Sequence, residues 1–283
     1  MSLFLISFFI LYGSLHYYIF SRVREAFSPG LLTLGLLAFF LLLMVSAPIV
    51  VYTAASRDWD LLARIYGHIG FVWMGIAFLF FAGAMAVNLY RLIAAAAGWF
   101  VPGVLPSPGL FWRFVLPLAF ALIAAVYGYF DALNIRTERI TVKSPKIPAA
   151  RSPVRIAQIS DVHLGVIVRG DRLKRILGAV RQAAPDLFVS TGDLLDAQVE
   201  RLDELTGFLS EIRPRLGKYA ITGNHEYYAG LGKSLEFTRR AGFTLLRGES
   251  LVLDGWLNLA GVDDAAGAYQ GLVAGKPEGE LLS

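Results

Sequence analysis

Charged residues are almost absent from the first half of this 283-residue chain. Only six of the 26 Lys and Arg residues and four of the 22 Asp and Glu residues lie before residue 135. The remaining 148 residues hold 20 bases and 18 acids, which is a charge density typical of a water-soluble domain. The hydrophobic content of 56% is therefore an average over two parts that suit two different solvents.

Four apolar stretches in the first part are each long enough to cross a bilayer. A helix needs about 20 mostly apolar residues to cross a hydrocarbon core roughly 30 Å thick. The stretches are roughly Leu3–Phe20, Leu31–Tyr52, Tyr66–Tyr90 and Leu110–Phe130. Basic residues follow the first stretch and do not precede it, which disfavours a cleaved signal peptide. The sequence predicts an α-helical membrane bundle of four spans over residues 1–135.

The distribution of basic residues bears on the orientation of this bundle. Four spans place both ends of the bundle on one side, where the loops carry seven Lys and Arg residues against four on the other side. The positive-inside rule then favours a cytoplasmic soluble domain. Residues 136–152 form a basic linker that either lies along anionic headgroups or is a solvated flank of the last span. His16 and His68 lie near span ends and are interpreted as interfacial residues.

The second part of the chain alternates short strand-like stretches with amphipathic helical ones. Apolar residues two apart predict strands, and apolar residues three and four apart predict helices. We expect strands at 154–160, 187–190, 219–221, 243–246, 251–253 and 257–260, and helices at 171–184, 199–212 and 235–240. This alternation predicts an α/β layered domain over residues 153–283.

Polar side chains that suit metal binding follow the first three expected strands. They are, in chain order, Asp161 and His163, then Asp193 and Asp196, then Asn224 and His225. Open α/β sheets bind ligands at the carboxyl ends of their strands, so we expect these side chains to lie together. Oxygen and imidazole donors without a thiolate suit Mn, Fe or Zn, and the chain contains no cysteine. Two such ions about 3.5–4 Å apart can hold a hydroxide between them and neutralise a phosphate.

Three motifs resemble those of the calcineurin-like metallophosphoesterases. They are Asp161-x-His163, Gly192-Asp193-x-x-Asp196 and Gly223-Asn224-His225-Glu226, within a match from Pro153 to Asp264. The segment Gly261-Val262-Asp263-Asp264 is similar to a strand-end motif of the membrane-associated branch of this family. The resemblance implies an αββα sandwich with two divalent metal ions.

The resemblance also implies which residues bind the metals. Asp161 and His163 would bind the first metal, Asp193 would bridge both, and Asn224 would bind the second. The family pattern has three further histidines downstream, whereas the last histidine of this chain is His225. We therefore expect the chain to be truncated at its C-terminus within an incomplete metallophosphoesterase domain and to be poorly active.

The resemblance further implies a catalytic role for His225. It would contact the phosphate and protonate the leaving oxygen, oriented by Asp196, while a metal-bridging hydroxide attacks. Asp196 is followed by Ala197 and Gln198, where phosphoprotein phosphatases carry arginine and glycine. This departure disfavours a protein phosphatase.

The expected function is that of a membrane-anchored, metal-dependent phosphoesterase. The substrate would be a phosphorylated small molecule or lipid, and membrane-associated bacterial members of the family cleave UDP-2,3-diacylglucosamine on the way to lipid A. The expected location is the bacterial inner membrane, in contact with the lipid bilayer. The net charge of +4 is small, so no nucleic acid partner is expected. The alternative is a catalytically inert membrane scaffold or sensor with a degenerate phosphoesterase domain.

Overall fold

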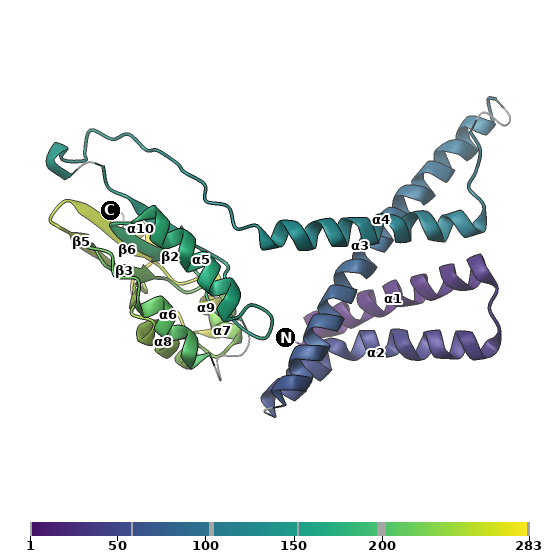
Figure 1. The fold of residues 1–283 in the computed structure, drawn as a ribbon, viewed down its shortest axis with the longest axis horizontal. Coiled ribbons are helices and arrows are strands. Elements are labelled where there is room, and N and C mark those ends of the chain that lie inside the picture. Colours follow the sequence, from purple (N-terminus) through teal and green to yellow (C-terminus); the bar gives the residue numbers. More distant parts are fainter. Residues whose placement is uncertain (1, 58, 102–104, 152, 197–201, 282–283) are drawn as a thin grey trace. The chain divides into compact units, whose positions relative to one another are not determined.

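Two compact units make up the chain in the computed structural model, residues 1–134 and 135–283 (Figure 1). The structure describes residues 2–57, 59–101, 105–151, 153–196 and 202–281. The basic linker falls at the start of the second unit, where its described residues are mostly irregular apart from one 3-10 turn at Ala149–Arg151.

The first unit consists of long helices. They are α1 (Ser2–Phe27), α2 (Leu31–Ser56), α3 (Asp60–Gly98) and α4 (Leu110–Leu133). Among the described helices, three are long and apolar enough to cross a membrane, namely Leu31–Ser56, Leu61–Gly98 and Leu110–Leu133. The first expected span lies within α1, which is not one of these three. The structure thus supports three of the four expected spans, and the first one, at Leu3–Phe20, is not confirmed.

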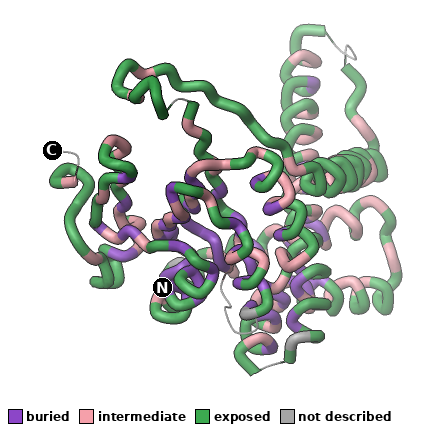
Figure 2. The backbone as a smooth tube through the Cα atoms, turned by 60° about the vertical axis from the view of Figure 1, so that its left-hand side comes forward, coloured by how far each residue is buried: buried purple, intermediate pink, exposed green. Residues whose placement is uncertain are grey.

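Small residues allow the helices of this unit to approach one another closely. A Cβ atom at Gly70 would lie 2.5 Å from the Cβ of Ala47, and one at Gly83 would lie 3.2 Å from the Cα of Pro117. These contacts join α3 to α2 and to α4, as is usual for membrane helices that pack through small side chains. Many large apolar side chains on the long helices point outward, and Figure 2 shows these helices largely as exposed.

His16 corrects one expectation about the bundle. Its side chain is buried, and its Nε2 accepts a hydrogen bond of 2.8 Å from Nε1 of Trp73. Its Nδ1 lies 2.7 Å from the backbone oxygen of Tyr12. His16 is therefore a packing residue between α1 and α3, whereas His68 is the more exposed histidine and bonds to Arg64 of its own helix.

A parallel sheet forms the middle of the second unit. Its strands are β1 (Ile156–Ile159), β2 (Leu187–Ser190), β3 (Lys218–Ala220) and β4 (Thr244–Leu245), in the spatial order β1-β2-β3-β4. Each strand pairs with the next strand along the chain, so all the connections cross the sheet in the same direction. Because such connections between parallel strands are right-handed, the connecting helices lie on one face of the sheet. These helices include α5 (Gly170–Ala183), α6 (Asp203–Ser210) and α8 (Leu231–Arg240). The main core lies between them and the sheet and contains Phe188 and Leu173.

An antiparallel hairpin packs against the other face of the parallel sheet. It consists of β5 (Glu249–Leu253) and β6 (Leu257–Gly261). Leu253 of the hairpin joins Leu187 of β2 and Leu216 in a second core. The described residues thus give a helix layer, a parallel sheet and a short second sheet. Short helices α7 (Asn224–Tyr228), α9 (Ala265–Gln270) and α10 (Glu278–Leu281) complete the unit.

The expected strands and helices lie close to the observed ones. The strand at 187–190 has the expected bounds, and each end of the other strands lies within two residues of its expected position. Residues 199–201 of the expected helix 199–212 lie outside the described residues, and the remainder contains α6. The short helix α7 was not expected, although it carries the third group of site residues.

Candidate metal centre

The loops after β1 and β2 are hydrogen-bonded to one another beyond the ends of their strands. The amide of Asp161 donates to the carbonyl oxygen of Gly192 over 3.2 Å, and the amide of His163 donates to that of Asp193 over 3.0 Å. The pairing continues at Leu164, whose amide donates to the carbonyl oxygen of Leu194. This pairing brings the candidate ligands of the first two strands to one place.

Three candidate ligands have a backbone conformation that L-residues rarely adopt. The φ angles are +52° at Asp161, +51° at His163 and +49° at Asp193. Only six non-glycine residues of the described part of the chain have a positive φ, and half of them are these candidates. Such conformations cost about 1–3 kcal/mol each and cluster at functional sites, where the surrounding structure enforces them. The strain therefore points to a constraint on where these side chains are placed.

Two glycines allow the second and third loops to touch. A Cβ atom at Gly192 would lie 2.9 Å from the Cα of Gly223, and φ at Gly192 is +102°. A Cβ atom at Gly223 would overlap the carboxylate and the amide of Asp193. Neither position accepts a side chain without separating the loops, which explains the glycines directly before Asp193 and Asn224.

One group of possible metal donors consists of Asp161, His163 and Asp193, each of which offers a donor atom within 4.8 Å of the others. Nε2 of His163 is 3.9 Å from Oδ1 of Asp161 and 3.9 Å from Oδ2 of Asp193. Donors about 2.1 Å from a common ion lie roughly 3.0–3.5 Å apart, so a small movement of the side chains brings this group to ligand distance. Two carboxylates and an imidazole fit a divalent ion of the Mn, Fe or Zn type.

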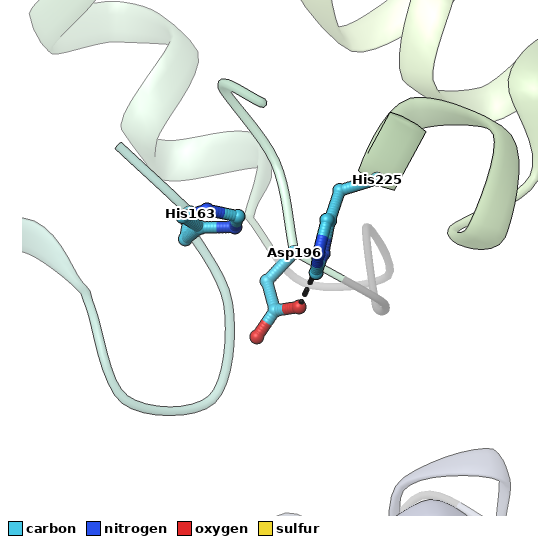
Figure 3. Close-up of side chains that lie close together, drawn as sticks. All are labelled: His163, Asp196 and His225. Carbon is cyan, nitrogen blue, oxygen red and sulfur yellow. Dashed lines mark hydrogen bonds and ion pairs between the residues drawn. The ribbon is translucent and has the colours of Figure 1, made fainter. Parts of the chain in front are cut away.

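A second group shares His163 and adds the side chains of Asp196 and His225 (Figure 3). Nδ1 of His225 is 3.2 Å from Oδ1 of Asp196. The ring of His225 packs edge-on against the ring of His163, with 4.4 Å between their centroids, and also contacts the ring of Tyr228 at 5.6 Å. A carboxylate beside one ring nitrogen fixes the tautomer and orientation of an imidazole.

Asn224 adjoins both groups through the backbone. It is half-buried at the start of α7, and the amide of the next residue, His225, donates to Oδ1 of Asp193 over 2.9 Å. The structure therefore brings all six candidate residues to the ends of three neighbouring parallel strands. Ala197 and Gln198, which follow Asp196, lie outside the described residues.

Glu226 holds two loops of the site together, and the motif in the sequence did not predict this role. Its buried carboxylate accepts hydrogen bonds from the amides of Gly223 at 2.7 Å, Asp193 at 3.0 Å and Leu195 at 3.0 Å. Burial raises its pKa, while these three backbone hydrogen bonds act in the opposite direction. Glu226 stands three residues after Gly223, the spacing of a capping box, and this spacing was a usable signal in the sequence.

Asp263 supports the third loop from the end of β6. Its buried carboxylate accepts two hydrogen bonds of 2.7 Å from Arg247 and one of 2.9 Å from Thr222, the residue before Gly223. Burial alone would raise the pKa of Asp263, but the hydrogen bonds from Arg247, from the Ala274 amide and from Thr222 hold it below its usual value. The segment Gly261 to Asp264 therefore has a positioning role in this structure.

Comparison with known proteins identifies the second unit. Residues 154–277 match the family described as calcineurin-like phosphoesterase. The chain carries a calcineurin-like metallophosphoesterase domain. This domain holds all six candidate residues. The family binds divalent metals, and the His and Asp groups of this phosphoesterase domain are able to hold one.

Several relatives share this domain. An uncharacterized metallophosphoesterase of Aquifex aeolicus is 39% identical over 162 residues, which cover 57% of this chain and 62% of that protein. A transmembrane protein with metallophosphoesterase domain from Danio rerio is 34% identical over 166 residues, which cover 56% of this chain and 38% of that protein. The UDP-2,3-diacylglucosamine pyrophosphatase LpxG of Chlamydia muridarum is 37% identical over 94 residues, 33% of this chain and 29% of that protein.

The matched region spans less than two thirds of each of these relatives. No solved structure matches the chain.

Proposed function

We propose that this protein is a membrane-anchored, metal-dependent phosphoesterase that hydrolyses a phosphoester or pyrophosphate bond at a membrane surface. The observation that carries the proposal is the convergence of Asp161, His163 and Asp193 at strained backbone positions, next to the paired His225 and Asp196. An unused site has no physical reason to maintain this strain. The apolar helices of the first unit support membrane anchoring.

The chain's own residues suit the binding of two divalent ions. Asp161 and His163 would hold the first ion, Asp193 would be a ligand shared by both, and Asn224 would hold the second. Bound divalent ions of the Mn, Fe or Zn type neutralise phosphate charge and lower the pKa of water. The carboxylate of Asp193 suits a shared position because its Oδ2 faces His163 while its Oδ1 faces the backbone that carries Asn224.

His225 is proposed as the residue that moves a proton. With Nδ1 held by Asp196, its Nε2 is the nitrogen that contacts the phosphate and gives a proton to the leaving oxygen. Asp196 keeps the imidazole oriented and stabilises its protonated form. The half-exposed ring of His225 is in reach of a substrate from solvent, and Tyr228, which is 61% exposed, lies next to it.

The proposed substrate is attached to a lipid. An enzyme anchored by apolar helices meets substrates in the plane of the membrane, and the relative from Chlamydia muridarum is named for UDP-2,3-diacylglucosamine, a nucleotide-linked lipid. Tyr228 supplies an exposed aromatic ring beside the site, which suits contact with the group next to the phosphate. We further propose that the protein lies in a bacterial inner membrane with the phosphoesterase domain in the cytoplasm.

Hydrolysis of bis(p-nitrophenyl) phosphate by the purified chain, with and without Mn²⁺, tests the activity. We expect Mn²⁺ to stimulate a slow hydrolysis, because the chain lacks the downstream histidines of the family pattern, and Asp193→Ala to abolish it. Asp171→Ala is the matched control, because Asp171 is an exposed acid at the start of α5. Hydrolysis by the Asp193→Ala variant at the wild-type rate would refute the site. No Mn²⁺-dependent hydrolysis by a folded wild-type chain would favour the inert scaffold instead.

Orientation has a separate test. Reporter fusions after residue 135 distinguish the two sides of the membrane, and a cytoplasmic reporter signal is expected. An external signal would contradict the proposed orientation without affecting the assignment of the active site.

A further inference from the structure

Arginines from three different helices of the first unit gather at one level of the bundle. Arg22 lies near the end of α1, Arg91 in the last third of α3, and Arg113 in the first turn of α4. Nη2 of Arg22 is 3.3 Å from Oδ1 of Asn88, and Nη1 of Arg91 is 3.5 Å from the same oxygen. Arg113 lies on α4, which packs against both α1 and α3. Two of the three like charges, Arg22 and Arg91, therefore converge around one neutral amide.

The guanidinium groups of Arg22 and Arg91 are partly buried. The side chain of Arg22 is only 14% exposed, and its guanidinium lies over the ring of Tyr18 at 4.8 Å. Nε of Arg91 is buried and has no hydrogen-bond partner among the described residues. A snorkelling arginine would hold its head in solvent, so partial burial of these heads needs another cause.

Acidic residues that would balance this charge are scarce. The two segments that carry the cluster, residues 20–31 and 86–115, contain the bases Arg22, Arg24, Arg91 and Arg113 and the single acid Glu25. Glu25 binds Arg22, with 3.0 Å between Nη1 and Oε2. Two positive charges thus remain uncompensated within these segments besides the exposed Arg24. Partly buried guanidinium groups attract an anion strongly, and phosphate suits their paired donors.

An apolar groove of about 490 Å³ lies between α3 and α4, close to Arg113. It is lined by residues of α3, of α4 and of the segment 106–108, namely Ala86, Val87, Tyr90, Pro106, Ser107, Pro108 and Leu116. Pro108 connects the two features, since Nε of Arg113 donates to its carbonyl oxygen over 2.8 Å. Hydroxyl groups are few along this lining, so its chemistry suits a hydrocarbon chain and not a polar ligand.

We propose that Arg22, Arg91 and Arg113 bind the phosphate of an anionic phospholipid whose acyl chain lies in this groove. A charged head beside an apolar groove is complementary to a phospholipid, whereas free phosphate would use only the arginines. The lipid would hold α1, α3 and α4 together at this level, because its phosphate joins bases from all three helices. The site is separate from the metal centre, which belongs to the second unit.

Lipid binding to the full chain in detergent tests this proposal by native mass spectrometry. We expect phosphatidylglycerol to bind about ten-fold more tightly than phosphatidylcholine of the same acyl composition, because the arginines favour a net negative head. The double variant Arg91→Gln/Arg113→Gln should lose this preference. Arg24→Gln is the matched control, since Arg24 is an exposed base of the same region and should have no effect.

A second variant leaves the charge unchanged. Ala86→Trp fills the groove and should weaken phosphatidylglycerol binding while all three arginines remain, and its helicity by circular dichroism checks folding. Equal binding of the two lipids by the wild-type chain would overturn the proposal, as would an equal loss in Arg24→Gln and the double variant. Displacement of phosphatidylglycerol by excess inorganic phosphate would also overturn it, because the occupant would then be the aqueous anion.

Discussion

The buried carboxylate of Glu226 accepts a hydrogen bond of 3.0 Å from the backbone amide of Asp193. The same carboxylate accepts from Gly223, so one side chain joins the loop after β2 to the loop after β3. Asp193 is the proposed shared ligand of two ions, and its position therefore depends on a residue that itself binds no metal. Groups that orient metal ligands in this way tune metal affinity almost as strongly as the ligands.

Replacement of this carboxylate should weaken metal binding. In Glu226→Gln, one acceptor oxygen becomes an NH2 group that faces a backbone amide, so at least one hydrogen bond is lost. We expect Mn²⁺ affinity to fall by about 10–100-fold. Calorimetric titration measures it, and Glu236→Gln, an exposed glutamate of α8, serves as the control. Unchanged affinity in Glu226→Gln would show that the loops keep their places without this carboxylate.

His225 should separate turnover from metal binding. Removal of a positioned general acid lowers kcat by about 10²–10⁴-fold, so His225→Ala should lose most of its turnover while keeping Mn²⁺ affinity close to that of the wild type. Steady-state kinetics and metal titration measure the two effects. Because His163, Asp196 and His225 also lie within 4.8 Å of one another, loss of metal in this variant would make His225 a ligand instead.

Gly223→Ala tests the contact between the loops. The new methyl group would overlap the carboxylate of Asp193, so the loops must separate. We expect a loss of about 1–3 kcal/mol of stability, as for other overpacked sites, together with weaker metal binding. Gly207→Ala in α6 is the control, because no atom lies within 4 Å of its added Cβ. Thermal unfolding of both variants compares them directly.

Metal stoichiometry follows from the number of donors. Asp161, His163 and Asp193 converge on the first ion, whereas Asp193 and Asn224 are the donors proposed for the second. We therefore expect Mn²⁺ titration of this 283-residue chain to show one site that binds more tightly than the other. Asp161→Ala should remove the tighter site. Two sites of equal affinity would contradict this assignment of ligands.

Lys218 should make stability depend on pH in the alkaline range. Its Nζ donates to the carbonyl oxygens of Leu209 at 2.7 Å and Ala241 at 2.6 Å. Burial, and to a smaller extent the charge of Arg213, lowers the pKa of Lys218 from 10.5 to about 8. The unfolded chain binds more protons than the folded chain between these values, so the contribution of Lys218 to the free energy of unfolding rises with pH.

Comparison with Lys218→Met isolates this effect. The difference in free energy of unfolding between wild type and variant should shift in favour of the wild type as pH rises from 8 to 10.5, and should be constant below that range. Thermal or denaturant unfolding across the range measures it. A shift in the opposite direction would mean that the folded chain holds the lysine charged more tightly than the unfolded chain does.

The strands and the site motifs could be predicted because both are local features. A short continuous apolar run predicts β2 as a buried strand with its observed bounds, and the site motifs directly follow the strand ends. The support of Asp193 by Glu226 and of Thr222 by Asp263 depends on contacts between distant loops, which local spacing does not encode. The burial of His16 likewise depends on a neighbouring helix, since Trp73 lies 57 residues away.

The strand order β1-β2-β3-β4 also has a consequence for how the centre forms. Each new strand pairs with the one made just before it, so the donors reach their common edge in the order in which a ribosome makes them. Asp161 and His163 emerge first, Asp193 and Asp196 next, and Asn224 and His225 last. Contacts of short sequence separation speed folding. The donors proposed here for the first ion are therefore all synthesised one strand earlier than Asn224, the further donor proposed for the second.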